Sequence, residues 1–186
     1  MTAEGSEADV PVRRFGWSDM FVDPDEDPRV DGGFENNERA MLVGYLSDRR
    51  LTFEMKCADL DAEGMARRSV PPSNMSLLGL LRHLADVERH WFRQEIAGLD
   101  VADLYGDDDF EGASPDPVLV DAAWETWREE VAFAEQLVVD SPELGVLGKR
   151  SGVPLREVLV YMIEEYARHN GHADLLRERI DGRVGQ

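Results

Sequence analysis

The sequence predicts an all-α protein arranged as an antiparallel four-helix bundle. Four segments of about 20–28 residues repeat apolar side chains at helical spacing, and none alternates with the period of two that is typical of a strand. The connections between these segments are long enough to join antiparallel neighbours. Hydrophobic residues make up 42% of the 186 residues, which is enough to form one sizeable core.

The chain is predicted to divide into residues 1–33, an irregular and partly disordered extension, and residues 34–186, the bundle. The extension opens with an acidic, polar stretch that is typical of disorder. Prolines, glycines and aspartates then break up any regular element. We expect this part to form an irregular strap whose apolar side chains pack on the bundle; these are Phe15, Trp17, Met20, Phe21 and Phe34.

The first two helices are expected to begin at polar capping residues. Asn36 or Asn37 caps the first, which runs to about Ala58 and leaves Arg49 and Arg50 exposed. The second is the segment SLLGLLRHLADVERHWFRQEIAGLD, capped by Ser73, Asn74 or Ser76. The intervening loop contains the helix-breaking residues Gly64, Pro71 and Pro72.

The last two helices are bounded by equally clear residues. The third follows Asp116-Pro117, a cap and a first-turn proline. The fourth follows Pro154 and ends at Asp181-Gly182. The loop before the third helix carries Asp107-Asp108-Asp109, which lacks the spacing of a helix–loop–helix calcium site, so we expect it to be a solvated acidic loop.

Charge and cysteine content limit the possible functions. The formal net charge of −19 argues against nucleic acid and anionic membranes as partners, because both attract basic patches. No apolar run approaches the roughly 20 residues that span a bilayer. Cys57 is the only cysteine, which fits a reducing cytoplasm and predicts a buried, unreactive thiol.

One face of the predicted fourth helix is apolar at both ends and ionisable in the middle. Its residues follow one another at steps of four or three: Val158, Met162, Glu165, His169, His172 and Leu176. Unpaired charge is costly to bury, so a carboxylate and two imidazoles on a core-facing stripe need to be neutralised. A metal ion would do so, and the spacing of Glu165 and His169 allows both to reach one ion.

A metal site of this kind needs a third ligand from another helix. His83, beside the core stripe of the second helix, is the leading candidate, and His172 is an alternative. His90 is weaker, because seven residues place it about 10 Å from His83 along the helix axis. In the competing interpretation His83 and His169 are hydrogen-bonded core histidines, and Glu165 pairs with an arginine, either Arg82 or Arg168. Spacing alone does not separate the two.

Two stretches, SVPPSNMSLLGLLRHLADVERHWF and EYARHNGHADLLRERIDG, resemble the signatures of the DinB-like superfamily. The similarity covers residues 34–182 and is greatest to actinobacterial DinB-like families of unknown function, related to mycothiol-dependent maleylpyruvate isomerases and thiol S-transferases. It implies a four-helix bundle that holds one divalent metal through His83, Glu165 and His169. Most members have histidine at the position of Glu165, but the isomerase branch resembles this sequence in having glutamate there. His172 would lie next to the ligands, and Arg168 is a candidate to orient a bound molecule.

The resemblance implies a metal-dependent thiol transferase. A low-molecular-weight thiol such as mycothiol would be activated at zinc, or at nickel or iron, and transferred to an electrophilic small molecule. The resemblance is also compatible with a homodimer. Two alternatives are a non-catalytic metal- or ligand-binding bundle, which a fourth protein ligand would favour, and a metal-dependent hydrolase.

Overall fold

The computed structural model describes residues 22, 27–29 and 37–184. These residues contain helices and no strand, so the predicted all-α class is confirmed. The predicted boundary after residue 33 lies outside the described residues. The five apolar side chains expected to form a strap, Phe15 to Phe34, lie outside them as well.

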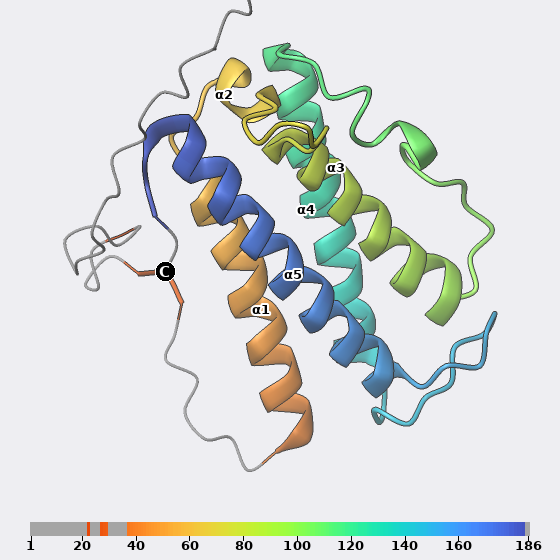
Figure 1. Ribbon diagram of the computed structural model, residues 1–186. Coiled ribbons are helices and arrows are strands. Elements are labelled where there is room, and N and C mark those ends of the chain that lie inside the picture. Colours follow the sequence, from red (N-terminus) through yellow and green to blue (C-terminus); the bar gives the residue numbers. More distant parts are fainter. Residues whose placement is uncertain (1–21, 23–26, 30–36, 185–186) are drawn as a thin grey trace, which may run out of the picture.

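Four long helical segments lie side by side (Figure 1). Their bounds are α1 (Glu38–Cys57), α3 (Leu77–Glu88) continued by the π-helix η3 (Arg89–Ile96), α4 (Pro117–Asp140) and α5 (Leu155–Asp181). Two short elements are α2 (Ala62–Ala66) and the 3-10 helix η4 (Gly106–Asp108). Among the described residues, no helix combines the length and the apolar character that crossing a bilayer requires.

The predicted capping residues define the helix ends. The side chain of Asn37 accepts hydrogen bonds from the N–H groups of Arg39 and Ala40 in the first turn of α1, and Ser76 and Asp116 likewise accept one each at the starts of α3 and α4. Gly182 ends α5 in the left-handed conformation, with φ of 82°, which glycine adopts without steric cost. These boundaries were therefore predictable from local chemistry.

Besides the short η4, which lies in the predicted acidic loop, two elements were not predicted. The segment between α1 and α3 contains the single-turn helix α2, whose cap Asp61 accepts a hydrogen bond from Gly64 N at 2.8 Å. The second predicted helix changes after Glu88 from α-helix to the π-helix η3, in which each N–H bonds one residue further back along the chain.

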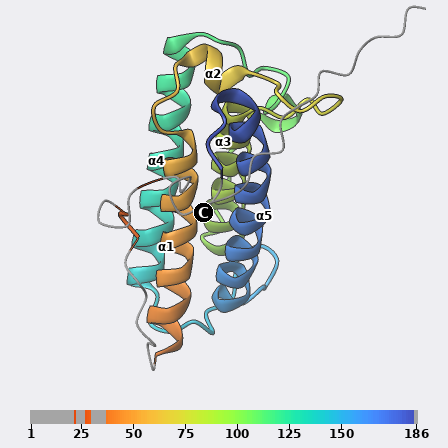
Figure 2. The same ribbon diagram turned by 60° about the vertical axis from the view of Figure 1, so that its left-hand side comes forward.

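Neighbouring helices α1 and α5 run in the same direction. Glu38 and Arg156, near the first turns of the two helices, lie 3.4 Å apart. Lys56 and Asp174, both in later turns, form an ion pair. The prediction of antiparallel neighbours is therefore wrong for this pair, and Figure 2 shows the two helices alongside one another.

Helices α3 and α4 also share one direction. Arg89 Nη2 forms an ion pair with Glu130 Oε1 at 2.7 Å. Further along both helices, the guanidinium of Arg93 lies 4.0 Å from the centre of the Phe133 ring. The connection at 97–116 crosses back to the end where α3 begins, as Figure 1 shows, so α4 starts there too. Helix α3 is antiparallel to α5, and this pair carries the ionisable cluster described below.

Arg50 is not exposed as the sequence predicts but is buried, with 6% of its surface accessible. Its Nε and Nη2 donate to the two carboxylate oxygens of Glu88 at 2.8 and 2.7 Å. The hydroxyl of Tyr166 also donates to Glu88, and Trp127 Nε1 donates to that hydroxyl, each at 2.8 Å. One continuous network therefore links α1, α3, α4 and α5 in the core.

Candidate metal centre

Three predicted ligands from two helices meet in the structure. His83 comes from α3, and Glu165 and His169 come from α5. One possible ligand atom from each side chain lies within 4.8 Å of the other two. Glu165 Oε1 is 3.2 Å from His83 Nε2 and 3.0 Å from His169 Nε2, so a single carboxylate oxygen faces two imidazole nitrogens.

The other side of His83 is held by the acidic loop. Its Nδ1 lies 3.0 Å from Asp109 Oδ2, within hydrogen-bond distance, and the side chain of Asp109 is only 15% exposed. The ring of Phe110 stacks against His83, with 5.8 Å between ring centres. The prediction of a solvated loop is therefore wrong for Asp109, although it fits Asp108, whose side chain is 69% exposed.

His172 lies beside the cluster and contacts His169. The Nδ1 atoms of the two rings are 3.3 Å apart, so one must carry the hydrogen and the other must accept it. This contact leaves Nε2 of His169 directed at Glu165. Burial, followed by the charge of nearby His83, lowers the pKa of His169. The neutral imidazole is thereby favoured, and this is the form that binds metals.

Glu165 is held as a carboxylate. Burial by itself raises the pKa of Glu165, but hydrogen bonds and charge from His83 and His169 outweigh it, and the net shift is downward. Arg168 Nη1 lies 3.9 Å from Glu165 Oε2, while its Nη2 donates to Glu164 at 2.8 Å. Arg168 is thus a half-exposed group at the rim of the cluster.

The remaining candidates lie elsewhere. Arg82 donates to the backbone oxygen of Asp108 and lies over the Tyr105 ring, so it is not the arginine that pairs with Glu165. The exposed His90 has its Nδ1 3.1 Å from Gln94 Oε1 and is not part of the cluster.

Cys57 is buried, with 4% of its surface accessible, as predicted. Burial raises the pKa of its thiol, so Cys57 is protonated at neutral pH and is unsuited to act as a nucleophile.

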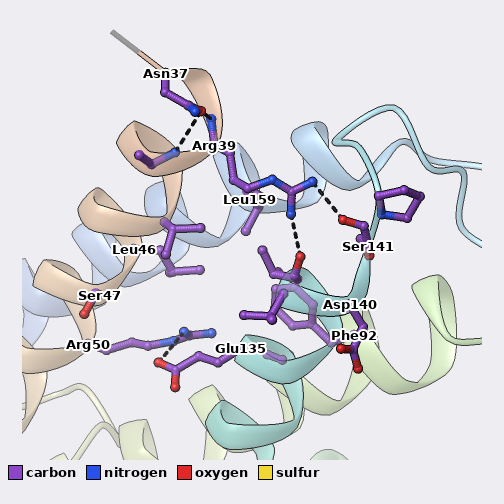
Figure 3. Close-up of a pocket in the computed structure, with 16 residues that line it drawn as sticks. Asn37, Arg39, Leu46, Ser47, Arg50, Phe92, Glu135, Asp140, Ser141 and Leu159 are labelled. Atoms are coloured by element: carbon purple, nitrogen blue, oxygen red, sulfur yellow. Dashed lines mark hydrogen bonds and ion pairs between the residues drawn. The ribbon is translucent and has the colours of Figure 1, made fainter. Parts of the chain in front are cut away.

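A cavity of about 830 Å³ lies between α1 and α4, away from the cluster (Figure 3). Apolar side chains such as Leu46 and Phe92 line it, and its charged groups are already engaged. Arg39 donates to two backbone oxygens at the end of α4, at 2.5 and 2.9 Å, and Arg50 lies 3.5 Å from Glu135. Among the described residues that line the cavity, each charged side chain already has a partner, so the His–Glu–His cluster is the better candidate for chemistry despite the size of this cavity.

Asp109 and Phe110 are the residues of this site that the sequence did not reveal. Both lie 26 or more positions from His83; nothing in the local sequence sets Asp109 apart from Asp107 and Asp108, and nothing links Phe110 to His83. Only the path of the loop brings them to the imidazole.

Comparison with known families supports the resemblance found in the sequence. The model of the family described as mycothiol-S-transferase matches residues 41–182, which include His83, Glu165 and His169. None of the curated proteins matches the chain in a sequence search. The family match spans most of the chain, from the first turn of α1 to the cap of α5. The protein therefore belongs to the mycothiol-S-transferase family, within the DinB-like group.

Proposed function

We propose that this protein is a metal-dependent thiol transferase built on a DinB-like four-helix bundle. It transfers a low-molecular-weight thiol, for which mycothiol is the candidate, to an electrophilic small molecule. Family membership supports the thiol chemistry. The convergence of His83, Glu165 and His169 supports the metal.

The observation that carries the metal proposal is the hydrogen bonding of His83. A neutral imidazole has only one N–H, whereas His83 faces a carboxylate at each nitrogen, Asp109 at Nδ1 and Glu165 at Nε2; we assign the hydrogen to Nδ1. Nε2 would then turn a lone pair toward the Glu165 carboxylate, which is repulsive unless a proton or a cation lies between them. A divalent cation would bind His83 Nε2, His169 Nε2 and the Glu165 carboxylate together and so remove this repulsion. Two imidazoles and one carboxylate suit zinc, which we propose, and also nickel or iron.

Each side chain has a distinct task in this proposal. A divalent metal held by His83, Glu165 and His169 would lower the pKa of a bound thiol and so favour the thiolate at neutral pH. His83 and His169 fix the position of the ligand atoms, and Glu165 offsets positive charge. The exposed Arg168 is placed to orient an anionic group of an incoming molecule. The thiol would release its proton to solvent, its sulfur would form a bond to an electrophilic carbon, and the leaving group would depart with the electron pair of the bond that breaks.

The test is a thiol-transfer assay with mycothiol and the fluorogenic electrophile monochlorobimane. The protein is assayed as loaded with zinc, after removal of metal by a chelator, and after zinc is restored. We expect the rate to fall about a hundredfold or more on metal removal and to recover on restoration. Equal rates with and without metal would reject the mechanism. Ester hydrolysis without thiol would favour a hydrolase, and retained metal without any turnover would favour a non-catalytic binding protein.

Replacing Asp109 by alanine is expected to weaken zinc binding about 10- to 100-fold, because the hydrogen bond that orients His83 is lost. Competition with a chromogenic zinc chelator measures the affinity. Asp107→Ala, in the same loop, removes an exposed carboxylate outside the cluster and serves as the matched control. If both variants bind zinc as tightly as the unmodified protein, Asp109 has no role in positioning His83.

A further inference from the structure

An aromatic pair lies between η3, which continues α3, and α5. The ring centres of Trp91 and Tyr161 are 4.8 Å apart, with 53° between the ring planes. Tyr161 is 41% exposed, and Trp91 is only partly buried against the core. The pair therefore presents aromatic surface to solvent.

The pair is close to the cluster because α3 and α5 are antiparallel. Tyr161 precedes Glu165 by four residues, which puts the two side chains on one helix face about 6 Å apart along the axis. Trp91 follows His83 by eight residues, about 12 Å along its own helix. Burial and then the charge of Glu165 raise the pKa of Tyr161, which agrees with this proximity. A small molecule at the cluster can reach the aromatic pair.

The local backbone and the opposite end of the cluster fit a binding role. Trp91 lies in the π-helix η3, and π-helices recur at functional sites in proteins. On the other side of His83 stands the Phe110 ring. The ionisable groups thus lie between Phe110 at one end and the pair of Trp91 and Tyr161 at the other, which gives a site with polar chemistry in the middle and apolar surface beyond it.

We propose that Trp91 and Tyr161 bind the planar apolar part of the electrophilic substrate and select aryl over alkyl electrophiles. Aromatic rings pack against other rings in offset or tilted contacts, and such contacts contribute more binding free energy than the buried area alone would give. This inference rests on the proposed thiol transfer, and it makes both side chains specificity-determining residues for that reaction.

Two electrophiles that share one reacting group test the inference. 2-Chloroacetophenone and chloroacetone are both α-chloroketones, and they differ in carrying a phenyl or a methyl group. With the zinc-loaded protein and mycothiol, we expect Tyr161→Ala and Trp91→Ala to raise KM for 2-chloroacetophenone about tenfold, with little change in kcat. KM for chloroacetone should not change. Tyr161→Phe keeps the ring and should behave as the unmodified protein does.

Tyr45→Ala is the matched control, because Tyr45 is an aromatic residue, 56% exposed, on the outer surface of α1. It should leave both KM values unchanged. Equal changes for the two electrophiles in Tyr161→Ala, or no change for either, would overturn the inference.

A binding measurement separates this inference from the proposed function. Unreactive acetophenone is titrated into the unmodified, zinc-loaded protein, and the Trp91 indole N–H is followed by NMR, with assignment from Trp91→Phe. A saturable shift of that resonance supports the aromatic binding surface, and its absence overturns it. If neither electrophile is turned over, the proposed transfer fails and this titration alone decides the inference. The same titration of the unmodified protein also tests the inference if one of the variants fails to fold.

Discussion

Replacing His83 by alanine is expected to reduce kcat/KM for thiol transfer about a thousandfold, equivalent to the loss of roughly 4 kcal/mol of transition-state stabilisation. His83 is the only contribution of α3 to the proposed metal site, and the two ligands left on α5 do not close it. The transfer of mycothiol to monochlorobimane measures the effect. Zinc is supplied in excess, so that a site with reduced affinity can still bind the metal.

His90→Ala is the matched control for that experiment. His90 is also a histidine of the same helical segment, but its ring contacts Gln94 and Trp91 instead of the cluster. Its replacement should change kcat/KM for this small electrophile by no more than a few-fold. A His83→Ala protein that keeps the activity of the unmodified protein would remove His83 from the site and take the proposed mechanism with it.

Replacing Glu88 by alanine is expected to lower the free energy of unfolding by about 3–5 kcal/mol, the largest effect on stability that the structure predicts. Glu88 is fully buried and accepts hydrogen bonds from Arg50 and Tyr166, so its loss leaves the Arg50 guanidinium charged and without its main partner in the core. At about 2–4 °C per kcal/mol for a protein of this size, Tm should fall by about 10 °C. Urea unfolding followed by circular dichroism measures the change.

Two further variants establish that the pairing itself causes the effect. Glu135 also approaches Arg50, at 3.5 Å, but its side chain is 56% exposed, so Glu135→Ala should cost no more than about 1 kcal/mol. The double variant Arg50→Met, Glu88→Leu removes both charges and should recover most of the lost stability. A free energy of unfolding for Glu88→Ala within about 1 kcal/mol of that of the unmodified protein would show that Glu88 does not stabilise the core in this way.

The helix ends and most of the cluster could be predicted from the sequence because they depend on short-range chemistry. Asn37 and Asp116 satisfy free N–H groups within two or three residues, and Gly182 supplies a conformation that few residues adopt. The spacing of Glu165 and His169 likewise determines that both lie on one helix face.

Other features depend on partners distant in the chain. Arg50 is buried because Glu88, 38 residues away, faces it across the core. The apolar pattern of α1 does not indicate that Arg50 has such a partner. Asp109 belongs to a run of three aspartates, and only the path of its loop separates it from the two exposed ones. The shared direction of α3 and α4 follows from where the 97–116 connection crosses, which its length permits but does not require.

The proposed function requires that His83, Glu165 and His169 hold one divalent metal ion. Elemental analysis of the purified protein after incubation with zinc and removal of excess metal tests it most directly. We expect about one zinc per chain in the unmodified protein and in His90→Ala, and little in Glu165→Ala when that variant shows the same helical circular dichroism. Absence of stoichiometric zinc from the unmodified protein, or full retention by folded Glu165→Ala, would contradict it.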